Sequence, residues 1–112
     1  MTTPEGKVKR DVDALLAKYP VYVFKPVQQG LGAAGLDYHC VICVNGSPVA
    51  FFIETKRPGG KPTDRQEGLI KRLRSEFRCN VFVVDGFIGF NSLEEWLKKV
   101  GRSDEHGNTR HD

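Results

Sequence analysis

The chain has 112 residues, of which 39% are hydrophobic and 28% charged, which is enough for one domain with one core and too little for two. No apolar run approaches the roughly 18 residues needed to span a bilayer, and the N-terminal MTTPEGKVKR lacks the apolar segment of a signal peptide. These features argue against a membrane protein and predict a soluble, intracellular one.

The net charge of +3 is unevenly distributed along the chain. Between Lys56 and Arg78 there are eight basic and three acidic residues, so this segment carries +5 and the rest of the chain −2. Such a basic segment is either a solvated helix face or a surface that binds phosphates. Charge alone does not decide between the two.

The chain begins with the pattern of a helix. Thr3-Pro4-Glu5 combines an N-cap, a proline at the first helical position and a first-turn acid. Apolar residues then recur at helical spacing from Val8 to Tyr19, and Pro20 ends the pattern. The following VYVFKPV, residues 21–27, has the composition of a strand.

The middle of the chain predicts a β-hairpin. YHCVICV and SPVAFFIETK are strand-like runs on either side of Asn45-Gly46, the strongest short-range signal for a hairpin. Cys40 and Cys43 form a C-x-x-C pattern inside the first run, where residues three apart point to opposite faces of a sheet. We therefore interpret them as buried packing cysteines rather than a zinc or redox pair.

The second half predicts a helix, a strand and a helix. Thr63-x-x-Gln66 is a capping box that opens a helix with Leu69, Ile70, Leu73 and Phe77 on one face. Residues 80–84 read as a short buried strand, and Ser92-x-x-Glu95 is a second capping box for the last helix. The order predicts an α/β fold, an antiparallel meander followed by a β-helix-β crossover. We expect one domain over residues 1–100 and a polar, disordered tail over 101–112.

Gly30-x-Gly32-x-x-Gly35 has the spacing of a dinucleotide-binding fingerprint. That fingerprint needs its glycines to open a helix, whereas these lead into a predicted strand, so we expect no nucleotide cofactor. Two interpretations remain: a loop whose missing side chains let the backbone approach a ligand, or a plain mobile connection.

The hairpin brings two carboxylates together. If Asn45-Gly46 is a two-residue turn, Asp37 lies directly opposite Glu54; a four-residue loop would place it opposite Lys56 instead. Like charges opposite one another in apolar surroundings are destabilising, so a positive group is expected between them. Lys56 is one such group, and a divalent cation such as Mg²⁺ is another. The alternative is a structural ion-pair cluster.

Two further polar residues have ambiguous positions. Glu5 continues the apolar stripe of Val8 and Val12, which places an acid on the buried side of the first helix, but it is also an ordinary first-turn acid. Gln66 completes a capping box and also lies on the face that packs on the sheet, and both roles are compatible.

Gly35-Leu36-Asp37, Glu54-Thr55-Lys56 and Gln66, together with Glu5, resemble the signature of the VRR-NUC family of the PD-(D/E)XK nuclease superfamily. The resemblance runs from about residue 4 to residue 84 and implies a restriction-endonuclease-like αβββαβ(α) core, a mixed sheet flanked by helices. The family usually has proline where this chain has Leu36, a difference that affects how the strand begins rather than the chemistry.

The resemblance implies metal-dependent hydrolysis of DNA. Asp37, Glu54 and the Thr55 carbonyl would hold Mg²⁺ or Mn²⁺, Lys56 would orient or deprotonate the attacking water, and Glu5 would support the metal. Gln66 would steady the site. The residues expected to contact DNA are Arg57, Lys61, Arg65, Arg72, Gly32 and Gly35.

Stand-alone chains of this length are similar to viral and bacterial members of the family and to archaeal Holliday-junction resolvases, which work as homodimers on four-way junctions. We therefore expect a homodimeric endonuclease for branched DNA in a bacterial or phage-infected cytoplasm. The alternatives are a nucleic-acid-binding module of the same fold that does not cleave, and a small interaction protein with an incidental charge cluster.

Overall fold

A computed structural model describes residues 3–27 and 35–107, with side chains described up to residue 101. The elements, in chain order, are α1 (Pro4–Leu16), β1 (Val21–Phe24), β2 (Tyr38–Val44), β3 (Ser47–Thr55), α2 (Asp64–Ser75), β4 (Asn80–Val84) and α3 (Phe87–Gly107). The predicted αβββαβ(α) order is confirmed.

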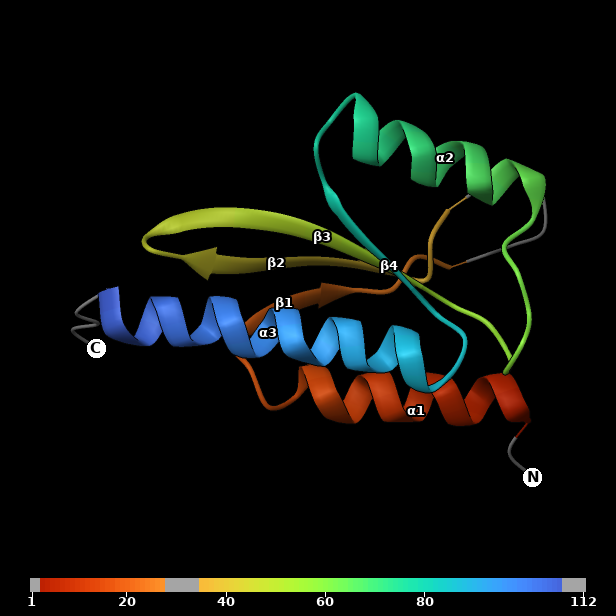
Figure 1. The fold of residues 1–112 in the computed structure, drawn as a ribbon, viewed down its shortest axis with the longest axis horizontal. Helices are drawn as coiled ribbons and strands as arrows, with labels where there is room; N and C mark the ends of the chain where they lie inside the picture. Colours follow the sequence, from red (N-terminus) through yellow and green to blue (C-terminus); the bar gives the residue numbers. More distant parts are fainter. Residues whose placement is uncertain (1–2, 28–34, 108–112) are drawn as a thin grey trace.

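The strands form one mixed sheet in the order β1-β2-β3-β4. β1, β2 and β3 are antiparallel neighbours, and β4 runs parallel to β3 after the α2 crossover. Helices α1 and α3 cover one face of the sheet and α2 lies on the other (Figure 1). The fold is therefore the predicted α/β arrangement with helices on both faces.

The hairpin turn sets the register of β2 and β3. Asn45 and Gly46 both have positive φ, 51° and 82°, as a two-residue type I′ turn requires. Val44 then pairs with Ser47, and at the other end of the ladder Tyr38 pairs with Ile53. The register predicted for a two-residue turn is confirmed, and Asp37 and Glu54 are the next residues beyond the Tyr38–Ile53 pair.

Two apolar clusters hold the layers together. The larger one lies between the sheet and helices α1 and α3, and includes Val12, Phe51 and Leu97, which are fully buried. The smaller one packs α2 on the sheet through Leu36, Ile70 and Val81. The α2 layer thus rests mainly on β3 and β4.

The capping signals predicted for α1 and α2 are confirmed. The Thr3 hydroxyl accepts a hydrogen bond from the Gly6 amide, and α1 ends at Leu16, before Pro20. At α2, the Thr63 and Gln66 side chains form both bonds of the predicted capping box. Phe77 is an exception, because α2 ends at Ser75 and the Phe77 side chain is 58% exposed instead of packing on the sheet.

The last helix differs from the prediction. It begins at Phe87 directly after Gly86, not at the Ser92 capping box, and it continues to Gly107. Leu93 and Leu97 are fully buried against the sheet. Because this tertiary packing stabilises the helix, it runs through Ser92 instead of starting there. Residues 101–107, predicted as part of a disordered tail, are helical, and residues 108–112 lie outside the described part.

The cysteines also differ in part from the prediction. Cys40 is buried, which raises the pKa of its thiol to about 12, whereas Cys43 is exposed on the opposite face of β2. The opposite orientation is therefore confirmed, but burial of Cys43 is wrong. Within the described residues, no helix is both long enough and apolar enough to cross a membrane.

Candidate active site

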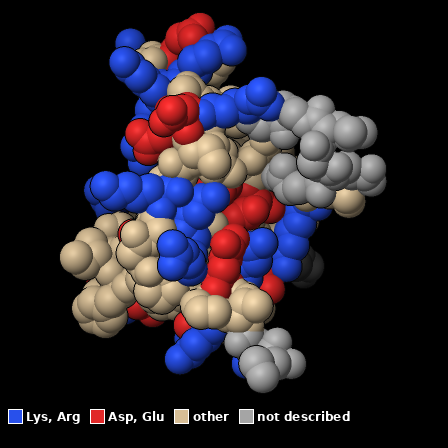
Figure 2. Space-filling view, turned by 90° about the vertical axis from the view of Figure 1, so that its right-hand side faces the viewer, with Lys and Arg blue, Asp and Glu red and all other residues tan. Residues whose placement is uncertain are grey.

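The sequence-predicted carboxylates meet at one end of the sheet. Asp37 precedes β2, Glu54 lies near the end of β3, and both α1 and α2 begin at this end of the molecule (Figure 1). Viewed from this side, acidic side chains occupy the middle of the surface with Lys and Arg side chains around them (Figure 2). The fold therefore places a small negative centre inside a positive rim.

Asp37 is fixed by the end of β3. Its Oδ2 accepts hydrogen bonds from the Thr55 amide at 2.8 Å and from the Thr55 hydroxyl at 2.7 Å. Its own amide donates to Glu54 Oε1 at 3.1 Å. Asp37 and Glu54 are thus linked as the register predicted, but the Asp37 carboxylate is held by Thr55, whose side chain was not part of the predicted site.

Glu54 is the most unusual residue of the site. Only 1% of it is exposed, although an ionised carboxylate is rarely buried to this extent. Burial raises the pKa of Glu54, the charge of Asp37 raises it further, and Lys56 partly offsets both. A buried acid with a neighbouring acid and one lysine is the environment in which functional carboxylates are found.

Lys56 and Gln66 both contact the same oxygen of this buried acid. Lys56 Nζ lies 3.2 Å from Glu54 Oε2, and Gln66 Nε2 donates to that atom at 2.8 Å. At the same time, Gln66 Oε1 accepts from the Thr63 amide at 3.0 Å. Gln66 therefore caps α2 and orients Glu54, so both of the roles left open for it are observed.

Glu5 is not buried, although its spacing from Val8 and Val12 had indicated the buried side of the first helix. Its side chain is 40% exposed and lies 3.7 Å from Lys9 Nζ, one helical turn along α1. Lys9 Nζ in turn lies 3.9 Å from Asp37 Oδ1. Among the described residues, Lys9 is the link between Glu5 and the site. The sequence interpretation missed Lys9, although its spacing of four from Glu5 was a signal for this pair.

The residues expected to bind DNA fall into two groups. Arg57, Lys61 and Arg65 are exposed in the loop before α2 and in its first turn, on the segment that follows Lys56. Arg72 lies six residues beyond Gln66, about 9 Å along the helix axis, and pairs with Glu76 at 2.8 Å. Gly35 precedes Leu36 and Asp37 and leads into a strand, as predicted, whereas Gly32 lies outside the described residues.

The side chains around Asp37 and Glu54 fit a hard divalent cation in composition. Mg²⁺ prefers oxygen ligands and commonly uses one or two carboxylates together with water. Here two carboxylates are held by hydrogen bonds at one sheet end, and Glu54 is kept away from bulk water. Within the described residues there is no group of three or more His, Cys, Asp or Glu side chains for a metal, so water and main-chain oxygen would complete the coordination.

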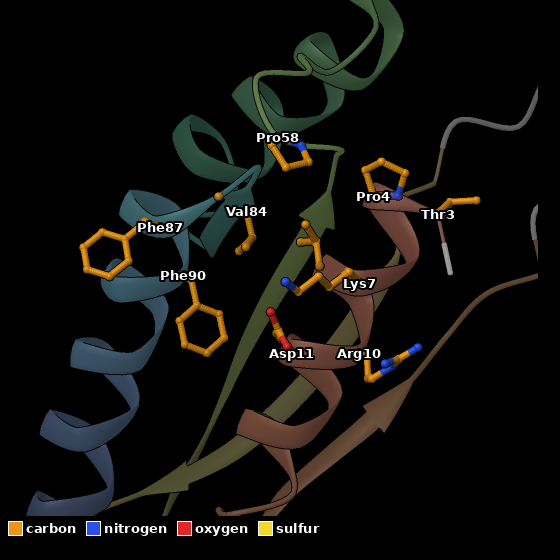
Figure 3. A pocket seen from close by; sticks show the side chains of 11 residues that line it. Thr3, Pro4, Lys7, Arg10, Asp11, Pro58, Val84, Phe87 and Phe90 are labelled. Carbon is orange, nitrogen blue, oxygen red and sulfur yellow. The ribbon is translucent and has the colours of Figure 1, made fainter. Parts of the chain in front are cut away.

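A cavity of about 610 Å³ lies apart from the carboxylates, between α1 and α3. Phe87 and Phe90 of α3 face Pro4, Lys7 and Asp11 of α1 across it (Figure 3). None of Asp37, Glu54, Lys56 and Gln66 lines this cavity. Phe87 is 78% exposed at its rim.

Comparisons with models of protein families, with curated proteins and with solved structures found no match to this chain.

Proposed function

We propose that this protein is a metal-dependent endonuclease that hydrolyses phosphodiester bonds in branched DNA. The observation that carries the proposal is the assembly of Asp37, Glu54, Lys56 and Gln66, contributed by separate segments, into one bonded cluster at the sheet end. A buried glutamate beside a second acid is costly for stability, and this cost supports a functional role over a purely structural one.

Each side chain has a defined task in this proposal. Asp37 and Glu54 would hold Mg²⁺ or Mn²⁺, with the Thr55 carbonyl as a further ligand. Thr55 orients Asp37 through two hydrogen bonds, and Gln66 orients Glu54 through one. Lys56 Nζ, beside Glu54, positions the attacking water by donating a hydrogen bond to it. When bound, the cation supplies a Lewis acid and lowers the pKa of water.

The surroundings suit a phosphate backbone. Arg57, Lys61 and Arg65 are exposed on the segment that follows Lys56, and Lys and Arg side chains surround the acidic centre of this surface (Figure 2). Such contacts give affinity without reading sequence, so selection by DNA shape is expected. A homodimer matches a four-way junction, which has two equivalent strands to cut.

The test is cleavage of a labelled four-way junction, with linear duplex and single strand alongside, in Mg²⁺, Mn²⁺ or EDTA. Lys56→Met is the informative variant, since it removes the ammonium but keeps the apolar stem. We expect the junction to be cut only with a metal, and Lys56→Met to cut at least about 100-fold more slowly. Lys98→Ala, an equal charge change on α3, should cut like the unmodified protein.

The second candidate is a binding module of the same fold that does not cleave, which the basic rim would also support. If the unmodified protein binds the junction but cuts no substrate with either metal, the nuclease proposal fails and the module replaces it. The intact set of Asp37, Glu54 and Lys56 favours the nuclease, because buried charges are costly to retain without use.

A further inference from the structure

The face of the sheet that carries Glu54 also carries a row of aromatic rings. Phe24, His39 and Phe52 lie directly opposite one another on β1, β2 and β3. The ring centroids of Phe24 and His39 are 6.0 Å apart, and those of His39 and Phe52 are 5.1 Å apart, both edge to face. We call these three residues the aromatic row.

The aromatic row begins beside the carboxylates. Phe52 lies two residues before Glu54, on the same face of β3 and about 7 Å away along the strand. His39 lies two residues after Asp37. The rings therefore lead from the proposed cleavage site across the sheet to its edge at β1.

The α2 helix covers only part of this face. Its apolar residues pack on Phe52, Val81 and Val83, that is, on β3 and β4. On the other half, Phe24 is 49% exposed, Val41 38% and Tyr22 66%, and Tyr22 pairs directly with Val41. The outer end of the aromatic row is thus open and is extended by a further exposed aromatic ring.

Exposed aromatic rings on an open sheet face are suited to stacking with nucleic-acid bases. The bases of an intact duplex are already stacked on each other, so only unpaired bases can use such a surface. The basic rim of the carboxylate site provides charge for the backbone of a strand.

We propose that Phe24, His39 and Tyr22 form a stacking surface for unpaired bases next to the phosphodiester bond that is cut. This inference rests on the proposed function and narrows it: among branched DNAs, the preferred substrates have single-stranded nucleotides beside the cleavage point. A second copy of the chain is the less suitable occupant, because three rings and a valine are far below the roughly 800 Å² that each partner buries in a stable interface.

The test measures binding in EDTA, where no metal-dependent cleavage occurs. The probes are a single-stranded oligonucleotide that contains 2-aminopurine and its fully paired duplex, added to the whole protein. Base stacking quenches 2-aminopurine, so the readout reports stacking and not attraction to the backbone. The variants are Phe24→Leu, which keeps apolar volume without the ring, and Tyr22→Ala. Phe87→Ala is the control, since Phe87 is more exposed than either ring but lies on α3.

We expect each ring variant to weaken single-strand binding by about 5- to 150-fold and to reduce the quenching, with duplex binding unchanged. Phe87→Ala should bind like the unmodified protein. Equal binding and quenching in the ring variants would overturn the inference, and so would a change of oligomeric state in Phe24→Leu with binding intact. Because cleavage is not needed here, a protein that stacks bases but cuts nothing refutes only the nuclease proposal.

Discussion

Glu54 determines how the site responds to pH, because its carboxyl group is almost completely buried. Three groups contact its two oxygens. The main-chain amide of Asp37 donates to Oε1, while the side-chain amide of Gln66 and the ammonium of Lys56 contact Oε2. These donors stabilise the charged form, but burial and the charge of Asp37 outweigh them, so the pKa remains raised. The ionised glutamate therefore costs folding free energy and is held in place by its neighbours.

The consequence is a specific dependence of stability on pH in the absence of metal. The folded-state pKa of Glu54 lies above the ordinary pKa of a glutamate. The stability that Glu54 contributes is therefore fully present at pH values below the ordinary pKa, and it is lost as pH rises through the folded-state pKa. The free energy of unfolding of the unmodified protein, relative to Glu54→Gln, should fall as pH rises from the ordinary pKa of a glutamate through the raised pKa of Glu54 in the folded state. Urea unfolding of both proteins in EDTA measures this, and a difference that stays constant or grows with pH would contradict it.

The capping box at the start of α2 connects this helix to the carboxylate site, because Gln66 belongs to both. Thr63→Ala removes only the N-cap bond and should cost about 1 kcal/mol of stability, with cleavage retained. Gln66→Ala also removes the donor to buried Glu54, so it should cost more stability and, in the nuclease assay, reduce the cleavage rate. Thermal unfolding and junction cleavage of the two variants separate capping from orientation. Equal loss of cleavage in both would show that Gln66 acts on the site only through the helix.

Gly89 of α3 and Gly68 of α2 differ in how closely neighbouring atoms pack around them. A Cβ at Gly89 of α3 would clash with the Val83 carbonyl oxygen, whereas nothing lies within 4 Å of one at Gly68 of α2. Gly89→Ala should therefore destabilise the protein by about 1–3 kcal/mol through overpacking. Gly68→Ala should stabilise it by about 0.5–1 kcal/mol because alanine favours a helix. Urea unfolding of both variants checks the pair, and a stabilised Gly89→Ala would refute the close contact of α3 with β4.

At the scale of the whole molecule, the proposed cation should act as a ligand of the folded state alone. Mn²⁺ at about 100 times its dissociation constant would add about 2.7 kcal/mol and raise the melting temperature by roughly 10 °C. Asp37→Asn should remove most of this shift, since its amide oxygen can still accept from Thr55 while the charge is lost. Thermal melts in Mn²⁺ and in KCl of equal ionic strength measure it. The same shift in both proteins would place the cation elsewhere.

The sequence alone was sufficient where the determining interactions are local. Asn45-Gly46 sets the hairpin register through the backbone angles of two residues, and that register brings Asp37 and Glu54 together. The caps at Thr3 and Thr63 likewise act within one helical turn. These signals predicted the order of elements and four polar residues of one cluster: Asp37, Glu54, Lys56 and Gln66.

Only the tertiary structure determined what depends on packing between distant segments. Lys9 reaches Asp37 because α1 packs across the sheet, and α3 starts at Phe87 because its apolar residues are buried against the strands. The aromatic row became visible only once α2 was seen to cover β3 and β4 and to leave Phe24 and Tyr22 open. Burial is set by which layers meet, and no stretch of a few residues encodes that choice.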